Sequence, residues 1–178
     1  MDSINKQQEE ENFENLQGAE AIKKIKALTD KGPSCFFCTH ITTGRPFITR
    51  PMSVQEVDDD GNLWFLSAND SHKNFEIKND SAVQLLFQGS SYSDFLNLYG
   101  IATISEDKEK IKQLWKPILK TWFTEGIDDP RISVIKVTPS EGYYWDTKHN
   151  MAIGLIKRVT GAILGKTMDD SIEGNIAV

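Results

Sequence analysis

Alternating hydrophobic and polar residues predict strands over much of the chain. The clearest case is 82–88, where Val83, Leu85 and Phe87 point to one face because side chains alternate along a strand. The full set of predicted strands covers 34–39, 46–57, 63–67, 82–88, 95–104, 132–138 and 143–146. The turn sequence DDDGN at 58–62 predicts a hairpin between the second and third of them.

Helical spacing appears between and outside these strands. It predicts a helix over 9–31, a short helix within 69–80, a helix over 106–123 with a kink at Pro117, and a weak amphipathic helix from Met151 followed by a polar tail. Strands joined mostly by antiparallel turns, with helices set around them, predict an α+β protein built on a small barrel or a strongly curled sheet.

Composition and charge narrow the classes of partner. At 178 residues, with 39% hydrophobic and 26% charged residues, the chain is an ordinary globular domain. Its net charge of −6 repels nucleic acid and anionic membrane surfaces, so we expect neither as a partner. No apolar run approaches the ~20 residues of a membrane helix, and the acidic start MDSINKQQEEENF does not resemble a secretory leader. We therefore expect a cytoplasmic protein.

The two cysteines, Cys35 and Cys38, have the spacing of redox and metal-binding motifs, but those motifs lie at helix starts. In SCFFCTHITTG they fall on a predicted strand, where residues three apart point to opposite faces. We interpret them as buried core thiols. The acidic turn at 58–62 lacks the spacing of a calcium loop, so no metal site is expected.

Arg50 interrupts an apolar strand face that includes Ile48, Met52 and Val54. A buried arginine without a partner is very costly, so this residue predicts a bound anion. His72 and Lys73 open the predicted helix at 69–80, and a helix N-terminus also favours anions. The hairpin would bring both groups to one side of the sheet and form a phosphate pocket. The alternative is two unrelated surface charges.

Several motifs together resemble the general stress protein branch of the pyridoxamine 5'-phosphate oxidase-like, FMN-binding split-barrel superfamily. They are ITTGRPFITRPMSVQEVDDDGNLWFLSANDSHK, GIATISEDKEKIKQLWKP, WFTEGIDDPRISVIKVTP and YYWD, and the similarity covers about 19–146. The resemblance implies a mostly antiparallel six-stranded split β-barrel with flanking helices. It also implies a homodimer with one FMN at each of two sites across the subunit interface. The chain would then divide into a polar extension with the helix start (1–18), the FMN-binding domain (19–148) and a C-terminal helix and tail (149–178).

The family's cofactor contacts can be carried over position by position. Arg50 would bind the FMN phosphate, and His72 and Lys73 would complete that phosphate site. The neighbouring strands would touch the flavin, and the partner subunit would contribute the tryptophan. The implied cofactor-binding residues are Arg50, Pro51, Met52, Ser53, Leu66, Ser67, His72, Lys73 and Trp145.

Other positions depart from the pyridoxamine phosphate oxidases. Gln55 stands where they carry a lysine near the substrate phosphate, and Phe95 stands where they use a glutamine. Their substrate-binding stretch after the tryptophan is replaced by DTKHNMAIG. Because a neutral amide cannot pair with phosphate as an ammonium does, oxidation of pyridoxamine phosphate is not expected. The other tryptophans, Trp64, Trp115 and Trp122, fall in apolar patterns and are interpreted as core or interface residues.

The sequence identifies no catalytic acid or base, because neither His40 nor His149 has a visible partner. A flavin carries its own redox chemistry, so a flavin-dependent oxidoreductase of unknown substrate is the first hypothesis, with NADH or NADPH as a candidate donor. A non-catalytic protein that binds or senses FMN is the second. A deazaflavin or haem in place of FMN is the third.

Overall fold

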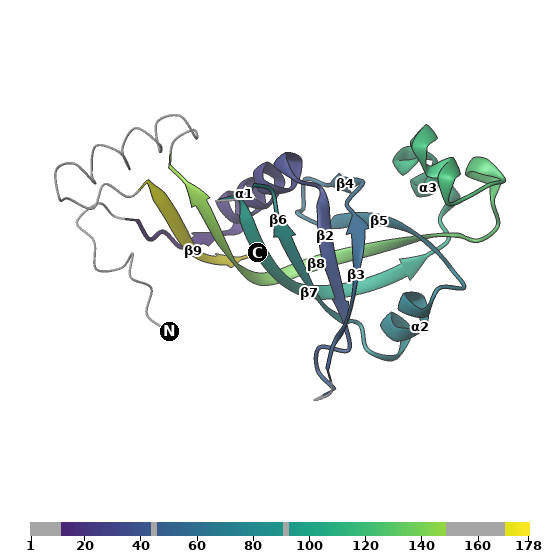
Figure 1. Ribbon diagram of the computed structural model, residues 1–178, viewed down its shortest axis with the longest axis horizontal. Helices are drawn as coiled ribbons and strands as arrows, with labels where there is room; N and C mark the ends of the chain where they lie inside the picture. Colours follow the sequence, from purple (N-terminus) through teal and green to yellow (C-terminus); the bar gives the residue numbers. More distant parts are fainter. Residues whose placement is uncertain (1–11, 44–45, 91–92, 149–169) are drawn as a thin grey trace.

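The structure of the protein is a computed structural model, and it describes residues 12–43, 46–90, 93–148 and 170–178 (Figure 1). The strands are β1 (Leu16–Gln17), β2 (Ser34–Thr39), β3 (Ile48–Ser53), β4 (Glu56–Val57), β5 (Leu63–Ala68), β6 (Ala82–Gln88), β7 (Phe95–Ser105), β8 (Ile132–Thr147) and β9 (Ser171–Ala177). The α-helices are α1 (Gly18–Lys31), α2 (His72–Asn79) and α3 (Lys108–Leu114), and the 3-10 helices are η2 (Pro117–Thr121) and η3 (Gly126–Asp128).

All described strands belong to one mixed sheet, with the main order β1-β9-β8-β7-β6-β2-β3. The sixteen residues of β8 make it the central strand. β8 pairs with β7 along one edge. It also pairs with β5 over Ile132–Val137 and with β9 over Glu141–Thr147. The pairings are antiparallel except for the parallel pair of β1 and β9.

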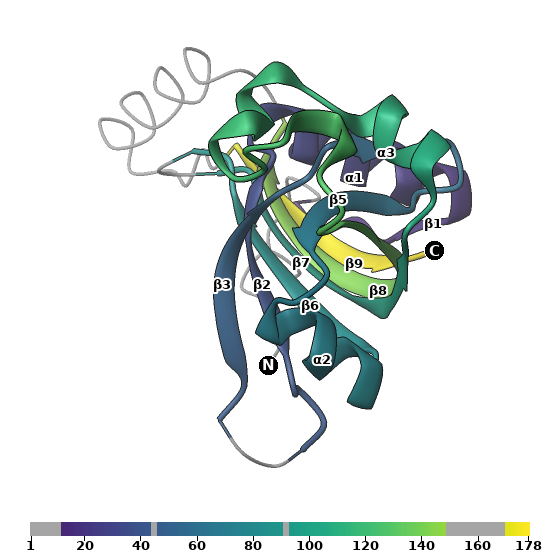
Figure 2. The same ribbon diagram turned by 90° about the vertical axis from the view of Figure 1, so that its right-hand side faces the viewer.

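The α+β class is confirmed, but the expected six-stranded split barrel differs from the structure in two respects. The sheet has nine strands, and it does not close because β3 pairs only with β2. Figure 2 shows the sheet strongly curled, with α2 and α3 on opposite sides of β5. Two of the additional strands, β1 and β4, are only two residues long, so no alternating pattern could reveal them.

The ends of the chain differ from expectation as well. The helix predicted over 9–31 begins at Gly18, where a positive φ of 53° turns the chain, because Leu16 and Gln17 pair with β9 instead. The helix predicted from Met151 lies outside the described residues. The polar tail that was expected after it includes β9, whose backbone pairing with β8 does not require an alternating sequence.

The expected hairpin at 58–62 is much shorter than predicted. Asp58 accepts hydrogen bonds from the Asn62 backbone N–H (2.8 Å) and from Trp64 Nε1 (2.8 Å), and so closes the turn. The turn joins only Glu56 and Val57 to β5. β3 pairs with β2 instead and has no pairing with β5.

Pro117 divides the helix that was predicted over 106–123. α3 ends at Leu114, and Lys116 is extended with φ −127° and ψ 143° because proline disfavours a helical residue before it. The chain then resumes as η2. A kinked helix was expected, and a complete break is observed, which leaves the segment around η2 free to turn toward β5.

Two groups of buried side chains hold the fold together. The first fills the space between α1 and the curled sheet, with Ile25, Phe37 and Phe65 fully buried. The second joins α3 and η2 to β5 and β8 through Leu66, Ile111, Leu114, Leu119, Phe123, Ile132 and Val134. Among the described residues, no helix has the length and apolar character needed to cross a membrane.

Candidate functional site

A pocket of about 520 Å³ lies where β3, β5, the start of α2 and the η2 segment meet. We call it the Lys73 pocket. It is lined by Ser34, Pro51, Met52, Ser53, Gln55, Leu66, Ser67, Ala68, Lys73, Leu119, Trp122 and Phe123. Its volume is within the range of roughly 300–1,000 Å³ that is usual for small-molecule sites. Six of the nine residues implied by the family resemblance are therefore brought together: Pro51, Met52, Ser53, Leu66, Ser67 and Lys73.

A buried polar network fixes the start of α2 against the sheet. Ser67 Oγ donates to Asn74 Oδ1 (2.9 Å), and Asn74 Nδ2 donates to Ser133 Oγ (2.8 Å). Ser133 Oγ in turn donates to the Ser67 carbonyl (3.0 Å). Because these groups are buried and satisfied, they hold the helix in one position. Lys73, one residue before Asn74, is thereby held at the pocket.

Lys73 is the cationic residue of this pocket. Burial, together with the positive charge of Arg50 nearby, lowers the pKa of its ammonium group. Within the described part of the chain, the Lys73 ammonium has no hydrogen bond and no ion pair with a carboxylate. Ser71, the residue before α2, makes no side-chain cap to the helix. The pocket therefore presents a partly desolvated positive charge beside an uncapped helix N-terminus, which together favour an anion.

Arg50 does not behave as the sequence predicted. Its guanidinium forms an ion pair with Glu76 (Nη2 to Oε2, 2.6 Å) and donates to Thr39 Oγ1 (3.3 Å). Thr39 also donates to Glu76 (2.6 Å). Although burial opposes ionisation of Glu76, the hydrogen bonds from Thr39 and Arg50 lower its pKa overall.

The expectation that Arg50 lacks a protein partner is therefore wrong, and the argument from an unpaired arginine to a bound phosphate fails. The strand face was misjudged too, because Ile48 is exposed and Met52 only half-buried. Arg50 does not line the Lys73 pocket, although its charge acts on Lys73. The carboxylate that pairs with it comes from α2, which the strand pattern alone could not reveal.

His72 and Trp145 also lie outside the pocket lining. The His72 side chain is exposed at the start of α2. Trp145 lies near the far end of β8, opposite Phe95 and Glu173, and its ring is 4.6 Å from that of Tyr143. With 42% of its surface exposed, Trp145 is available to a partner but makes no contribution to this pocket within one chain.

Trp122 lines the pocket, whereas its sequence pattern indicated a core or interface residue, as it did for Trp64 and Trp115. The interpretation of Trp64 and Trp115 as core residues is confirmed, since both pack against the second buried cluster. Trp122 instead is 64% exposed and lines the pocket. The signal that could have identified it is Pro117, which ends α3 and removes the helical periodicity that made Trp122 look like a core position.

The cysteines are confirmed as buried, free thiols, and burial raises the pKa of Cys35 to about 12. Such a thiol is inert at neutral pH. The parts of the chain that the structure describes contain no cluster of three or more metal-ligating side chains.

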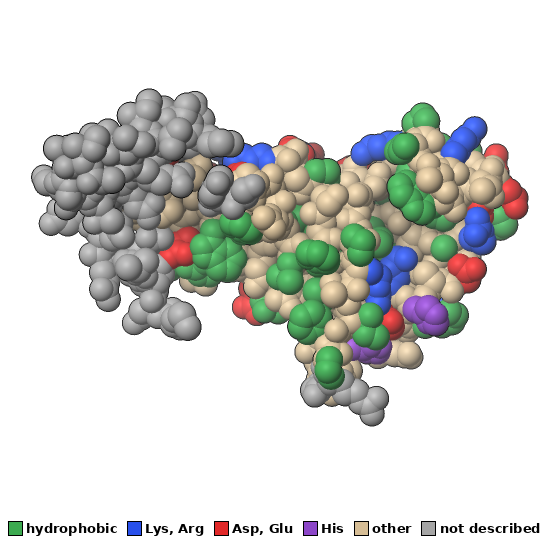
Figure 3. All heavy atoms as spheres, in the orientation of Figure 1, with side chains coloured by type: hydrophobic (Ala, Val, Ile, Leu, Met, Phe, Trp, Pro, Cys, Tyr) green, Lys and Arg blue, Asp and Glu red, His purple; other side chains and the backbone are tan. Residues whose placement is uncertain are grey.

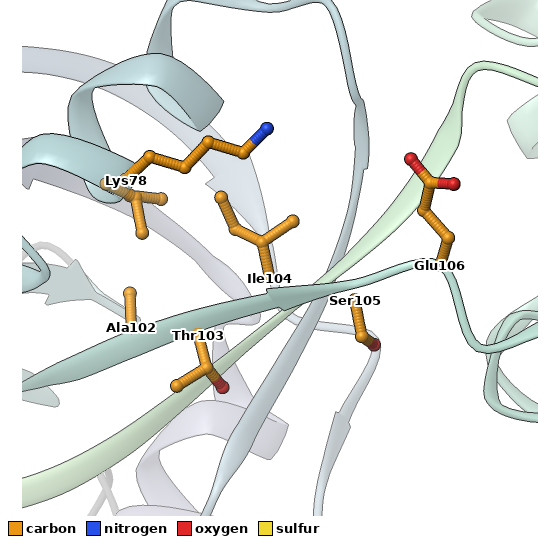
Figure 4. A pocket seen from close by; sticks show the side chains of 7 residues that line it. Lys78, Ala102, Thr103, Ile104, Ser105 and Glu106 are labelled. Atoms are coloured by element: carbon orange, nitrogen blue, oxygen red, sulfur yellow. The ribbon is translucent and has the colours of Figure 1, made fainter.

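A second pocket of about 450 Å³ lies between α2 and the end of β7. Figure 4 shows that Ile104 points toward α2 while Thr103 and Ser105 point away from it, as alternation along a strand requires. Lys78 and Glu106 contribute opposite charges to its lining. No site residue predicted from the sequence lines it, so we place the functional site at the Lys73 pocket.

The chemistry available in the Lys73 pocket is limited. None of its lining residues is a carboxylate, an imidazole, a thiol or a phenol. Lys73 is the titratable group there, and its hydroxyl-bearing neighbours are serines. The pocket can hold an anionic group and an apolar ring, but it offers no pair of groups for general acid–base catalysis.

Comparisons with known proteins point to one family. The sequence profile described as pyridoxamine 5'-phosphate oxidase like matches residues 20–169. Protein bli-3 of Neurospora crassa is 27% identical over 128 residues, which are 67% of this chain. The matched region is only 61% of the length of that curated relative.

Solved structures share the fold. A protein of Jannaschia sp. CCS1 assigned to general stress protein 26 superposes with a TM-score of 0.75 and 20% identity, over 88% of this chain and 97% of that one. General stress protein 26 of Bacillus anthracis gives a TM-score of 0.59 at 22% identity, over 69% and 92%. The general stress FMN/FAD binding protein of Xanthomonas citri gives 0.56 at 20% identity, over 68% and 84%.

Proposed function

Because the chain belongs to the pyridoxamine 5'-phosphate oxidase-like family, we propose that the Lys73 pocket binds FMN and that the protein is a flavin-dependent oxidoreductase. The observation that carries this proposal is the unpaired, partly buried Lys73 at one side of a pocket of about 520 Å³. The names of its structural relatives support a flavin and a role in stress.

The residues present fit FMN. An ammonium and a helix N-terminus suit a phosphate, because both supply positive charge and donors. Met52, Leu66 and Trp122 supply apolar surface for a ring. The pocket contains no carboxylate that would repel an anion. In this arrangement Lys73 replaces Arg50 as the first phosphate ligand. Arg50, which is ion-paired with Glu76, would contribute only through its charge.

The protein's own residues would bind and orient rather than transfer protons. Lys73 would hold the phosphate, and the β3 and β5 side chains would exclude water from one face of the ring. A bound flavin supplies hydride and electron transfer. Gln55, whose amide donates to the Ser53 carbonyl (3.0 Å), offers no charge for a second phosphate, so pyridoxamine phosphate is not the proposed substrate.

We also propose a homodimer in which Trp145 of one chain completes the site of the other. An apolar face of the sheet supports it: Phe36, Tyr99 and Ile101 are exposed on β2 and β7. Figure 3 shows hydrophobic side chains gathered over this part of the sheet. Exposed patches of this kind mark interaction surfaces. Light scattering of the purified protein checks the proposal, and a monomer at micromolar concentration would contradict it.

A second candidate function is FMN binding without turnover. It is favoured by the absence of any carboxylate, imidazole or thiol from the lining of the Lys73 pocket. Storage or sensing of a flavin needs affinity and nothing more. The two candidates differ in whether bound flavin exchanges electrons with a small molecule.

One experiment separates these functions. The protein is loaded with FMN, unbound flavin is removed, and NADH or NADPH is added without oxygen. Loss of the visible flavin band supports an oxidoreductase. A retained band with these and with chemically different donors supports the binding protein. If FMN does not bind at all, both functions are excluded, and the absorption spectrum of the protein as purified would reveal a haem or a deazaflavin.

A further inference from the structure

The large apolar side chain of Trp122 is exposed at the Lys73 pocket. It is 64% exposed, whereas Leu119 and Phe123 on either side of it are buried. No described residue forms a hydrogen bond with the Trp122 indole or stacks on it. An exposed tryptophan with no partner offers a large, rigid surface for a ligand.

The backbone turn that carries Trp122 is held in place by its neighbours. Leu119 and Phe123 are anchored in the second buried cluster, and the Phe123 ring lies 6.3 Å from that of Trp115. The Leu119 carbonyl accepts hydrogen bonds from the backbone N–H groups of Trp122 (3.0 Å) and Phe123 (3.0 Å). The indole is therefore presented from an ordered turn, and little conformational entropy would be lost when it contacts a ligand.

The pocket has two chemically different sides. Lys73 and Ser67 come from α2 and β5 and are cationic and polar. Leu119, Trp122 and Phe123 come from the η2 segment and are apolar. A ligand that satisfies both sides carries an anionic group and a planar, uncharged ring.

We propose that Trp122 is the ring-binding residue of this site and that the ring is recognised independently of the phosphate. The inference rests on the proposed function, since the ring is taken to be that of a flavin. It goes further than the proposed function because it states that the η2 segment of the same chain binds the ring. It follows that riboflavin, which has the ring and no phosphate, also binds.

The test compares two ligands and three variants. Binding of FMN and of riboflavin is measured by quenching of flavin fluorescence in the parent, Trp122→Ala and Trp122→Phe. Ile118→Ala is the matched control, because Ile118 lies in η2, which ends directly before Trp122, and is 67% exposed but does not line the pocket. Urea unfolding of each variant checks that it is folded.

We expect Trp122→Ala to weaken FMN and riboflavin by the same factor, about tenfold. Trp122→Phe keeps an aromatic face and should lose less than about threefold. Ile118→Ala should bind both ligands as the parent does. If Trp122→Ala binds both like the parent, or if Ile118→Ala is equally weakened, the inference is overturned while FMN binding stands. A parent that binds neither ligand overturns the proposed function and this inference together.

Discussion

Two partly buried lysines, in different parts of the molecule, differ in whether a carboxylate of the protein contacts them and in the direction in which their pKa is shifted. Lys31, at the end of α1, contacts Asp94 (2.5 Å) and Asp146 (3.2 Å). Burial alone would lower its pKa, but the hydrogen bond with Asp94 and the charge of Asp146 raise it overall. Lys73, at the start of α2, has no such carboxylate contact among the described residues, and burial lowers its pKa.

The comparison separates charges that hold the fold from charges available to a ligand. Lys31 joins α1 to the end of β8 and is compensated within the chain. Lys73 carries a desolvation cost that the charges of Glu76 and Asp70 offset only in part, which is expected where an anion supplies the missing partner. Arg50 resembles Lys31 in this respect, because Glu76 already neutralises it.

The largest effect on stability is expected from removing the carboxylate that compensates Lys31. Asp146 is buried and accepts from Lys24 (3.0 Å) as well as Lys31, so Asp146→Asn leaves two ammonium groups without their shared carboxylate. We expect a loss of about 2 kcal/mol in the free energy of unfolding, since Lys31 is half-exposed and partly screened. Urea unfolding measures it.

Asp59→Asn is the matched control for Asp146→Asn, because Asp59 is fully exposed and lies 3.6 Å from Lys26. An exposed pair contributes little, so the control should unfold like the parent. Neither change should alter FMN affinity. Equal unfolding curves for the two variants would show that burial does not distinguish these ion pairs.

The next effect is on ligand affinity. Lys73→Ala removes the cation of the pocket, and a charged hydrogen bond is worth about 1.5–3 kcal/mol, so FMN should bind roughly 10- to 100-fold more weakly. Stability should not fall, because a partly buried ammonium whose pKa is lowered overall is lost with the side chain. Titration of flavin fluorescence and urea unfolding measure the two quantities.

Lys78→Ala serves as the control for Lys73→Ala, because Lys78 lies on the same helix, is exposed and does not line the Lys73 pocket. FMN should bind this variant as it binds the parent. A Lys73→Ala protein with parental FMN affinity would remove the main support for the phosphate site.

The contrast also explains how much the sequence could predict. β6 is found where alternation placed it, because a strand with one buried face records that face in its own residues. β9 could not be predicted in this way, since it is defined by its pairing with β8. Backbone hydrogen bonds do not depend on side-chain type and leave little trace in the sequence.

The site follows the same rule. Pro51, Met52 and Leu66 line the pocket because they lie on strands that the motif places correctly. The pairing of Arg50 with Glu76 joins residues 26 positions apart on different elements, and no local pattern encodes it. The place of Trp122 in the pocket lining was not predicted for a related reason, because its exposure depends on the break at Pro117 and on what the η2 segment packs against.

The smallest effect on FMN affinity is expected from removing the carboxylate of Glu76, which pairs with Arg50. In the parent, the charges of Arg50, Lys73 and Glu76 sum to one positive charge, whereas Glu76→Gln leaves two beside the pocket. FMN carries a phosphate dianion at neutral pH, so we expect this variant to bind FMN a few-fold more tightly, with no change for riboflavin. Fluorescence titration with both ligands measures this difference, and Glu109→Gln, at an exposed residue of α3, is the control.

The pH dependence of stability gives Glu76→Gln a second readout. The folded-state pKa of Glu76 is below its ordinary value, so its ionised form stabilises the protein above the unfolded-state pKa. That contribution is lost as the pH falls through the folded-state pKa, and Glu76→Gln should lack it at every pH. If the variant loses this acid-dependent stability but binds FMN like the parent, Arg50 is a structural residue like Lys31, and the phosphate depends on Lys73 and the start of α2.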